Sequence, residues 1–74
     1  MSYRLIIDTT TSSKTELMAR LQQQPFILEC RDAGAYREDP MLSKIEVTSQ
    51  IDEYAMDEWM YEQKGVDCLG VSSI

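Results

Sequence analysis

The order of strand-like and helix-like segments constrains this chain more than any single motif does. Residues 3–8 (YRLIID) alternate and are rich in β-branched side chains, and residues 26–31, 44–48 and 66–71 form three further strand-like segments. One helix is predicted between the first two strands and another between the last two. The resulting β-α-β-β-α-β order predicts an α+β ferredoxin-like fold, in which two helices cover one face of an antiparallel four-stranded sheet.

Both predicted helices begin at a capping-box-like pair. Ser13 and Glu16 predict the start of the first helix, and Ser49 and Asp52 predict the start of the second. Gly65 is expected to end the second helix. The residues from 32 to 41 are expected to form a loop, with short extensions of the flanking strands.

Apolar periodicity identifies the side chains that should face the helices. Leu28 and Cys30 belong to this face of the second strand, whereas Ile6 and Ile27 are expected on the open face of the sheet. The remaining predicted core residues are Leu5, Ile7, Leu17, Met18, Leu21, Phe26, Ile45, Val47, Ile51, Ala55, Met56, Trp59 and Met60.

The 74 residues predict a single domain, 1–74, without a linker or a low-complexity segment. Cys30 and Cys68 lie in strands that this fold places at opposite edges of the sheet, so we expect two free thiols. A signal-peptide pattern is absent, and no apolar run reaches the roughly 18 residues that span a bilayer. We therefore expect a cytoplasmic protein with no membrane partner.

Charge narrows the classes of partner. Thirteen acidic residues oppose seven basic ones, which gives a formal net charge of −6. Such a chain repels nucleic-acid phosphates, so direct nucleic-acid binding is disfavoured. The same charge favours a protein partner with a basic surface.

The sequence offers little for catalysis, metal ions or cofactors. It contains no histidine, so neither Ser13 nor Cys30 has the usual base beside it, and a structural zinc site lacks ligands. Residues 8–15 (DTTTSSKT) faintly resemble a phosphate-binding loop but lack its glycines. We therefore predict no enzyme, no metal site and no cofactor.

The second helix carries the most informative surface. Five residues are expected to lie away from its buried stripe, and no Lys or Arg follows them at i+4. Exposed tyrosines beside uncompensated carboxylates are typical of an interface in which aromatic groups anchor the partner and acids steer it. An acidic face that is merely solvated remains the alternative. We call these five residues the acidic face: Glu53, Tyr54, Asp57, Glu58 and Tyr61.

These observations favour a small acidic protein-interaction and regulatory module that binds a basic protein through the acidic face. In size, acidity and lack of catalytic groups, the chain resembles in type the small accessory proteins with which phages inhibit or redirect host enzymes, such as nucleic-acid-handling enzymes. A nucleic-acid mimic is one alternative. Another is a self-associating structural or ligand-binding domain that dimerises through sheet edges or through the open face bearing Ile6 and Ile27.

Overall fold

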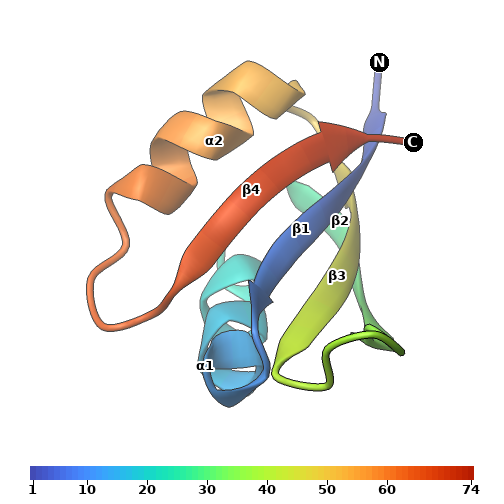
Figure 1. Ribbon diagram of the computed structural model, residues 1–74. Helices are drawn as coiled ribbons and strands as arrows, with labels where there is room; N and C mark the ends of the chain where they lie inside the picture. Colours follow the sequence, from blue (N-terminus) through green and yellow to red (C-terminus); the bar gives the residue numbers. More distant parts are fainter.

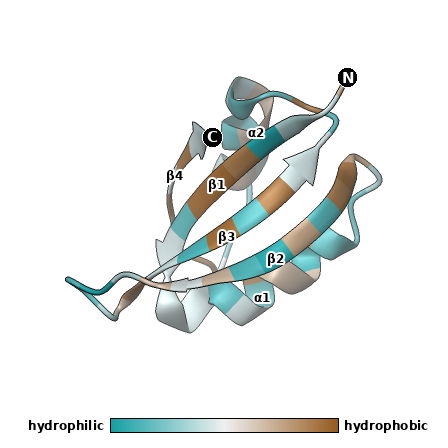
Figure 2. Ribbon diagram, turned by 90° about the vertical axis from the view of Figure 1, so that its right-hand side faces the viewer, coloured by the Kyte–Doolittle hydropathy of each residue, from teal (hydrophilic) through white to brown (hydrophobic).

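The structure is a computed structural model that describes residues 1–74 (Figure 1). It confirms the β-α-β-β-α-β order and a four-stranded antiparallel sheet, in which the strands lie in the order β2-β3-β1-β4. Figure 2 shows both helices behind the sheet, on the same face. The elements are β1 Tyr3–Thr10, α1 Thr11–Gln22, β2 Ile27–Ala35, β3 Leu42–Ser49, α2 Glu53–Tyr61 and β4 Cys68–Ser73.

One buried cluster joins the two central strands to both helices. Alternate residues of β1 and β3 point into it, as the sequence pattern predicts, and each helix contributes two residues. Its members are Leu5, Ile7, Leu17, Leu21, Ile45, Val47, Met56 and Met60. Ile51 and Trp59 pack against the cluster while staying half-buried. The prediction of Ala55 as a core residue is wrong, because Ala55 is exposed at the first turn of α2.

The face assignment for the start of β2 is also wrong. Ile27 packs against the core, whereas Leu28 keeps 56% of its surface exposed. The pairing register shifts between Ile27, opposite Ser49, and Glu29, opposite Thr48. Leu28 is the additional residue of this bulge, which reverses the expected alternation. After the bulge the prediction is correct again, because Cys30 lies opposite Val47 and packs against the core.

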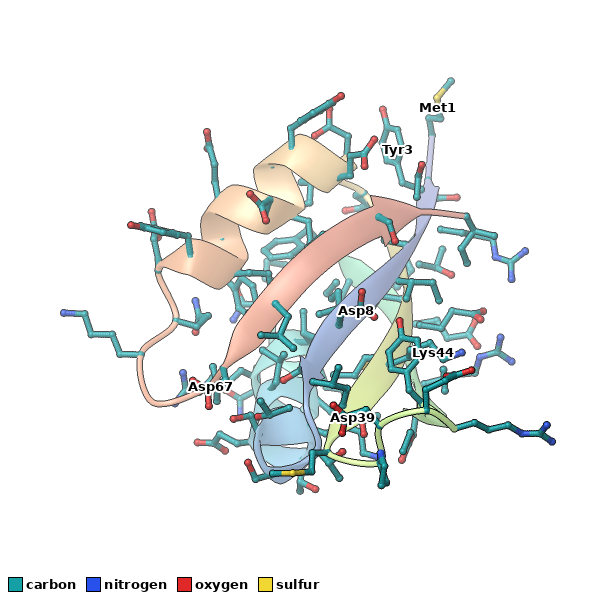
Figure 3. All side chains as sticks on the ribbon, in the orientation of Figure 1. Met1, Tyr3, Asp8, Asp39, Lys44 and Asp67 are labelled. Carbon is teal, nitrogen blue, oxygen red and sulfur yellow. The ribbon has the colours of Figure 1, made fainter.

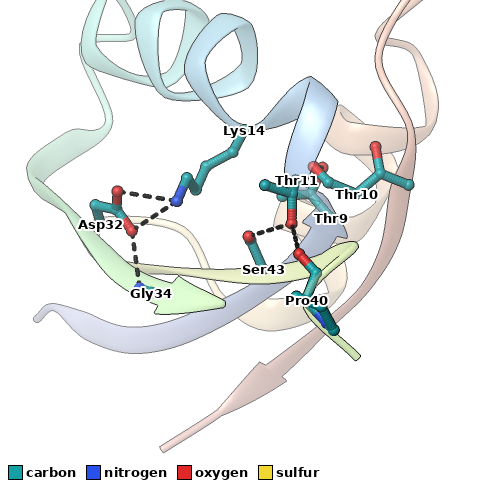
Figure 4. A network of polar contacts seen from close by, with 8 residues as sticks. All are labelled: Thr9, Thr10, Thr11, Lys14, Asp32, Gly34, Pro40 and Ser43. Carbon is teal, nitrogen blue, oxygen red and sulfur yellow. Dashed lines mark hydrogen bonds and ion pairs between the residues drawn. The ribbon is translucent and has the colours of Figure 1, made fainter. Parts of the chain in front are cut away.

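β2 extends further into the expected loop than the sequence suggests. A second register shift lies between Asp32 and Ala35, where Gly34 has a φ angle of +87°, a conformation that favours glycine. The Asp32 carboxylate accepts a hydrogen bond from the Gly34 N–H at 2.8 Å and pairs with Lys14 at 3.0 Å (Figure 4). These contacts tie the end of β2 to α1.

The first helix begins three residues before the predicted position, because its N-cap is Thr10 and not Ser13. α1 starts at Thr11, whose hydroxyl donates to the Pro40 carbonyl at 2.7 Å and shares a hydrogen bond with the Ser43 hydroxyl (Figure 4). Ser13 is buried within the first turn and does not cap the helix. Its hydroxyl instead accepts a hydrogen bond from the Asp67 N–H at 3.0 Å. Tertiary contacts have thus replaced the local capping pattern.

The second helix begins three residues after its predicted start. Asp52 is its N-cap, and the carboxylate accepts a hydrogen bond from the Ala55 N–H at 2.9 Å. Ser49 is a buried β3 residue whose hydroxyl bonds to the backbone of Ile51. α2 ends at Tyr61, so Gly65 lies in the following loop.

Cys30 and Cys68 are both free. They lie in β2 and β4, the two edge strands, as the sequence order predicts. Neither helix has the length and apolarity that a membrane span requires.

Candidate functional site

α2 is held to the core by one side of its surface. Met56 and Met60 are fully buried, and the Trp59 ring meets the Phe26 ring edge-on at a centroid distance of 5.9 Å. This packing fixes the rotation of the helix about its axis. The other side of α2 consequently faces outward, and oxygen-tipped side chains project from it in Figure 3.

The structure places four residues of the predicted acidic face in solvent. Tyr54 and Tyr61 expose 75% and 92% of their surfaces, and Asp57 and Glu58 are exposed. Glu53, in the first turn, is half-buried. Glu53, Asp57 and Tyr61 are spaced four residues apart and lie along one side of the helix, while Tyr54 and Glu58 lie along the adjacent side.

A groove of about 320 Å³ separates α2 from β4. Asp57 and Tyr61 of the acidic face line it, whereas Glu53, Tyr54 and Glu58 do not. The other lining residues are Met60, Gln63, Val66, Cys68, Leu69, Gly70 and Val71. We call this cavity the α2–β4 groove. Its lining combines hydrophobic side chains with a carboxylate and a phenol from the helix.

The sequence analysis missed this groove. Its only sequence signal is that the last strand carries apolar residues on both faces, with Cys68 and Val66 on one and Leu69 and Val71 on the other. A register shift opposite Asp8 and Thr9 then leaves Leu69 55% exposed. The position of a groove depends on this tertiary placement.

The loop between α2 and β4 is fastened at both ends. The Arg20 guanidinium donates to the Lys64 carbonyl at 2.8 Å, and the Thr9 hydroxyl donates to the Asp67 carbonyl at 2.6 Å. The Gln63 side-chain amide donates a hydrogen bond to the Trp59 carbonyl at 3.2 Å. These bonds anchor the loop on both sides of Val66, which lines the groove.

The ion pairs of the chain lie away from α2. Every ion pair involves a sheet or α1 residue, and none involves the acidic face. Lys44 lies over the Tyr36 ring at 5.0 Å, in a cation–π contact. The ion pairs are Arg4–Glu46, Arg31–Glu46, Arg31–Glu29, Lys14–Asp32 and Arg20–Glu16.

The open face of the sheet is polar and internally paired. Arg31 and Arg4 hydrogen-bond to Glu46, which lowers the pKa of that carboxyl. Tyr36 donates a hydrogen bond to Asp8, which raises the pKa of the phenol. Figure 3 shows Asp8 and Lys44 on this side of the sheet. Ile27 is not part of this face, contrary to the sequence prediction, because the β2 bulge turns it toward the core.

A second hollow, of about 740 Å³, lies at the start of α1, at the DTTTSSKT turn. Its lining includes Thr10, Thr11 and Ser12 together with the carboxylates of Asp39 and Asp67. Lys14 points away from these hydroxyls and pairs with Asp32 (Figure 4). Two carboxylates without a facing cation repel an anion, so this turn does not provide a phosphate site.

No cluster of three or more His, Cys, Asp or Glu side chains is arranged to hold a metal ion. The thiols of Cys30 and Cys68 are half-buried, and this burial raises the pKa of each. Such thiols are weak nucleophiles at neutral pH.

No family model, curated protein or solved structure matches this chain. The chemistry of α2 and of the α2–β4 groove is therefore the basis for proposing a function.

Proposed function

We propose that this chain is a small acidic protein-interaction module of ferredoxin-like fold, which binds a basic protein surface through the acidic face of α2. It acts by binding and regulating its partner, without catalysis, a cofactor or direct nucleic-acid contact. A cytoplasmic nucleic-acid-handling enzyme is the kind of partner that fits, because such enzymes carry basic surfaces.

The observation that carries the proposal is the segregation of charge. The helix and its two caps hold five carboxylates, of which none has a Lys or Arg partner within salt-bridge distance. Like charges at this spacing cost folding free energy of a few tenths of a kcal/mol per pair. A partner that supplies Arg and Lys would offset this repulsion. The five carboxylates belong to Asp52, Glu53, Asp57, Glu58 and Glu62.

The tyrosines supply the apolar part of such an interface. Tyr54 and Tyr61 are the most exposed aromatic side chains of the chain. A tyrosine has few rotatable bonds, so its immobilisation costs little entropy and its ring buries a large area. Tyr54 and Tyr61 are therefore the proposed anchors, and the carboxylates steer the encounter.

The test is affinity capture from a lysate of the cells in which the protein is made, followed by mass spectrometry. The baits are the wild-type protein, Tyr54→Ala and Glu58→Lys. Glu38→Lys, on the exposed β2–β3 loop, is the matched control, because both charge reversals change the net charge from −6 to −4. We expect one partner that Tyr54→Ala and Glu58→Lys lose and Glu38→Lys retains. Retention by all three variants, with circular dichroism unchanged, would show that the proposal is wrong.

A further inference from the structure

β4 has a free edge beside the α2–β4 groove. It pairs only with β1, since the sheet order is β2-β3-β1-β4. Hydrogen-bonded and non-hydrogen-bonded residues alternate along an antiparallel pair. The Ile74 N–H bonds to the Arg4 carbonyl, and the register pairs Leu5 with Ser73. The backbone groups of Ser73, and of Val71 two residues earlier, therefore point away from β1.

A strand added at this edge would send alternate side chains into the groove. Residues directly opposite one another in a sheet point to the same face. The side chain of Val71 lines the groove, so the residue opposite Val71 would enter it as well. That residue would enter a groove whose lining residues are mostly hydrophobic, which favours an aliphatic side chain.

The next position on the helix side of the added strand, opposite Ser73, would lie just beyond the groove and beside the acidic side of α2. α2 runs antiparallel to β4, so the end of β4 lies beside the start of the helix (Figure 1). Glu53 and Asp57 lie on one side of that part of the helix, and Asp57 lines the groove. Ser73 lies beyond the lining of the groove, so the residue opposite it would leave the groove on the side of the helix that carries Glu53 and Asp57. These carboxylates have no cation partner, which favours Lys or Arg at this position.

We propose that the α2–β4 groove binds an extended segment of the partner protein, which pairs with the free edge of β4 and carries an aliphatic and a basic residue two positions apart. This inference rests on the proposed function and specifies how the basic partner binds. Strand addition is a common mode of peptide recognition, in which main-chain hydrogen bonds supply affinity and pockets supply specificity.

Charge favours this occupant over a second copy of the chain. Two copies paired through β4 would bring together two acidic helices on molecules of net charge −6 each. Neither copy has a cation in the groove to offset the repulsion. A basic segment would neutralise the unpaired carboxylates of α2, whereas a second copy would bring further carboxylates next to them.

The probes are synthetic peptides as long as β4, which has six residues. They carry Leu and Arg two positions apart, in both orders, on a threonine background, with Glu in place of Arg as the control. Binding is measured by fluorescence anisotropy at low salt and at about 0.5 M NaCl. We expect the Leu/Arg peptides to bind at low salt and to weaken severalfold at high salt, and the Leu/Glu peptides not to bind.

Backbone pairing is tested on both partners. Every second amide of a paired peptide points toward β4, and the amides between them point away. N-methylation of the first set should abolish binding, and N-methylation of the second set should not. On the protein, Ser73→Pro removes an amide that points away from β1, whereas Ser73→Ala keeps it. We expect Ser73→Pro to weaken binding about five- to tenfold relative to Ser73→Ala, the loss of roughly one hydrogen bond.

Three outcomes would overturn this inference: no peptide binds, the two N-methylated sets behave alike, or Ser73→Pro binds as well as Ser73→Ala. A dimer in light scattering that Ser73→Pro dissociates would also overturn it, because a second copy would then occupy the edge.

Capture experiments with the native partner distinguish this inference from the proposed function. Capture lost with Glu58→Lys but kept with Ser73→Pro would support the acidic face and refute strand addition. Capture lost with Ser73→Pro but kept with both Tyr54→Ala and Glu58→Lys would refute the outer-face interface and support the groove.

Discussion

Individual carboxylates in this protein have very different surroundings. Glu46, on the open face of the sheet, accepts hydrogen bonds from Arg31 and Arg4. Asp57 and Glu58, on α2, have no basic partner. The paired carboxylates have contacts that depend on the folded state and the unpaired ones do not, so the two groups should respond differently to acid and to mutation.

The pairing of Glu46 predicts an acid-sensitive contribution to stability. Its folded-state pKa lies below the usual value of 4.5, because of the hydrogen bonds from Arg31 and Arg4. The unfolded state therefore takes up the proton first, so the stabilisation is complete above that value and is lost as the pH falls through the folded pKa. In urea titrations between about pH 5 and pH 3, the unfolding free energy of Glu46→Gln should fall less steeply than that of the wild type.

Asp32→Asn provides the comparison for this measurement. The Gly34 N–H and Lys14 lower the pKa of Asp32, so this variant should also flatten the pH dependence. Equal slopes for Glu46→Gln and the wild type would contradict the role assigned to the Arg4–Glu46–Arg31 pairs.

At the scale of elements, α2 depends on the rest of the fold. It has nine residues, fewer than an isolated helix needs to be stable in water. Its N-cap, two buried methionines and the Trp59–Phe26 contact hold it in place. Presentation of the acidic face therefore requires the cap and the core, as well as the acidic residues themselves.

Removal of the cap should destabilise the protein measurably. Asp52→Ala deletes the acceptor of the Ala55 N–H, which should lower the unfolding free energy by about 1 kcal/mol. Asp52→Asn keeps an acceptor and should lose less. Asp57→Ala, in the exposed middle of the helix, should stay within about 0.5 kcal/mol of the wild type. Chemical denaturation followed by circular dichroism measures all three, and equal losses for Asp52→Ala and Asp57→Ala would rule out the cap.

The element order, the buried faces of β1 and β3 and the exposure of Tyr54, Asp57, Glu58 and Tyr61 could be predicted from sequence. These properties follow from periodicity, which is local. The bulge at Leu28 could not, because an extra residue in a strand appears only when its partner strand is in place. The capping errors have a similar origin, since Ser13 bonds to Asp67, far along the chain.

Part of the candidate site could also be predicted from the sequence. Helical spacing alone locates the acidic face on one surface of the second helix. The α2–β4 groove requires the register of β4 against β1 and the fastening of the loop by Arg20 and Thr9. Those contacts join residues distant in sequence, so a local pattern does not reveal them.

At the scale of the whole molecule, charge and polarity divide the surface into distinct regions. The open sheet face bears paired charges, α2 bears unpaired carboxylates, and the groove between α2 and β4 combines hydrophobic side chains with exposed polar groups. No ion pair within the chain involves α2 or a residue that lines the groove. The helix and the groove adjoin each other through Asp57 and Tyr61, which belong to the acidic face and also line the groove.

The sheet order also predicts the redox behaviour of the chain. Cys30 and Cys68 lie on edge strands separated by β3 and β1, about 14 Å apart at the usual strand spacing. A disulfide needs a Cα separation below about 7 Å. Mild oxidation should therefore give no intramolecular bond, and intact mass spectrometry after alkylation under denaturing conditions should find two modified thiols. A single species with a Cys30–Cys68 bond would contradict the strand order.

The edge-on contact between Trp59 and Phe26 gives the protein an intrinsic optical signal. Trp59 is the only tryptophan in the chain, and it lies half-buried on the inner side of α2, while the groove lies beside its neighbour Met60. Its emission wavelength should therefore change if α2 shifts against the sheet in a way that alters the exposure of the indole ring. Binding of the proposed partner to this helix should thus be detectable by fluorescence in the unlabelled, unmodified protein.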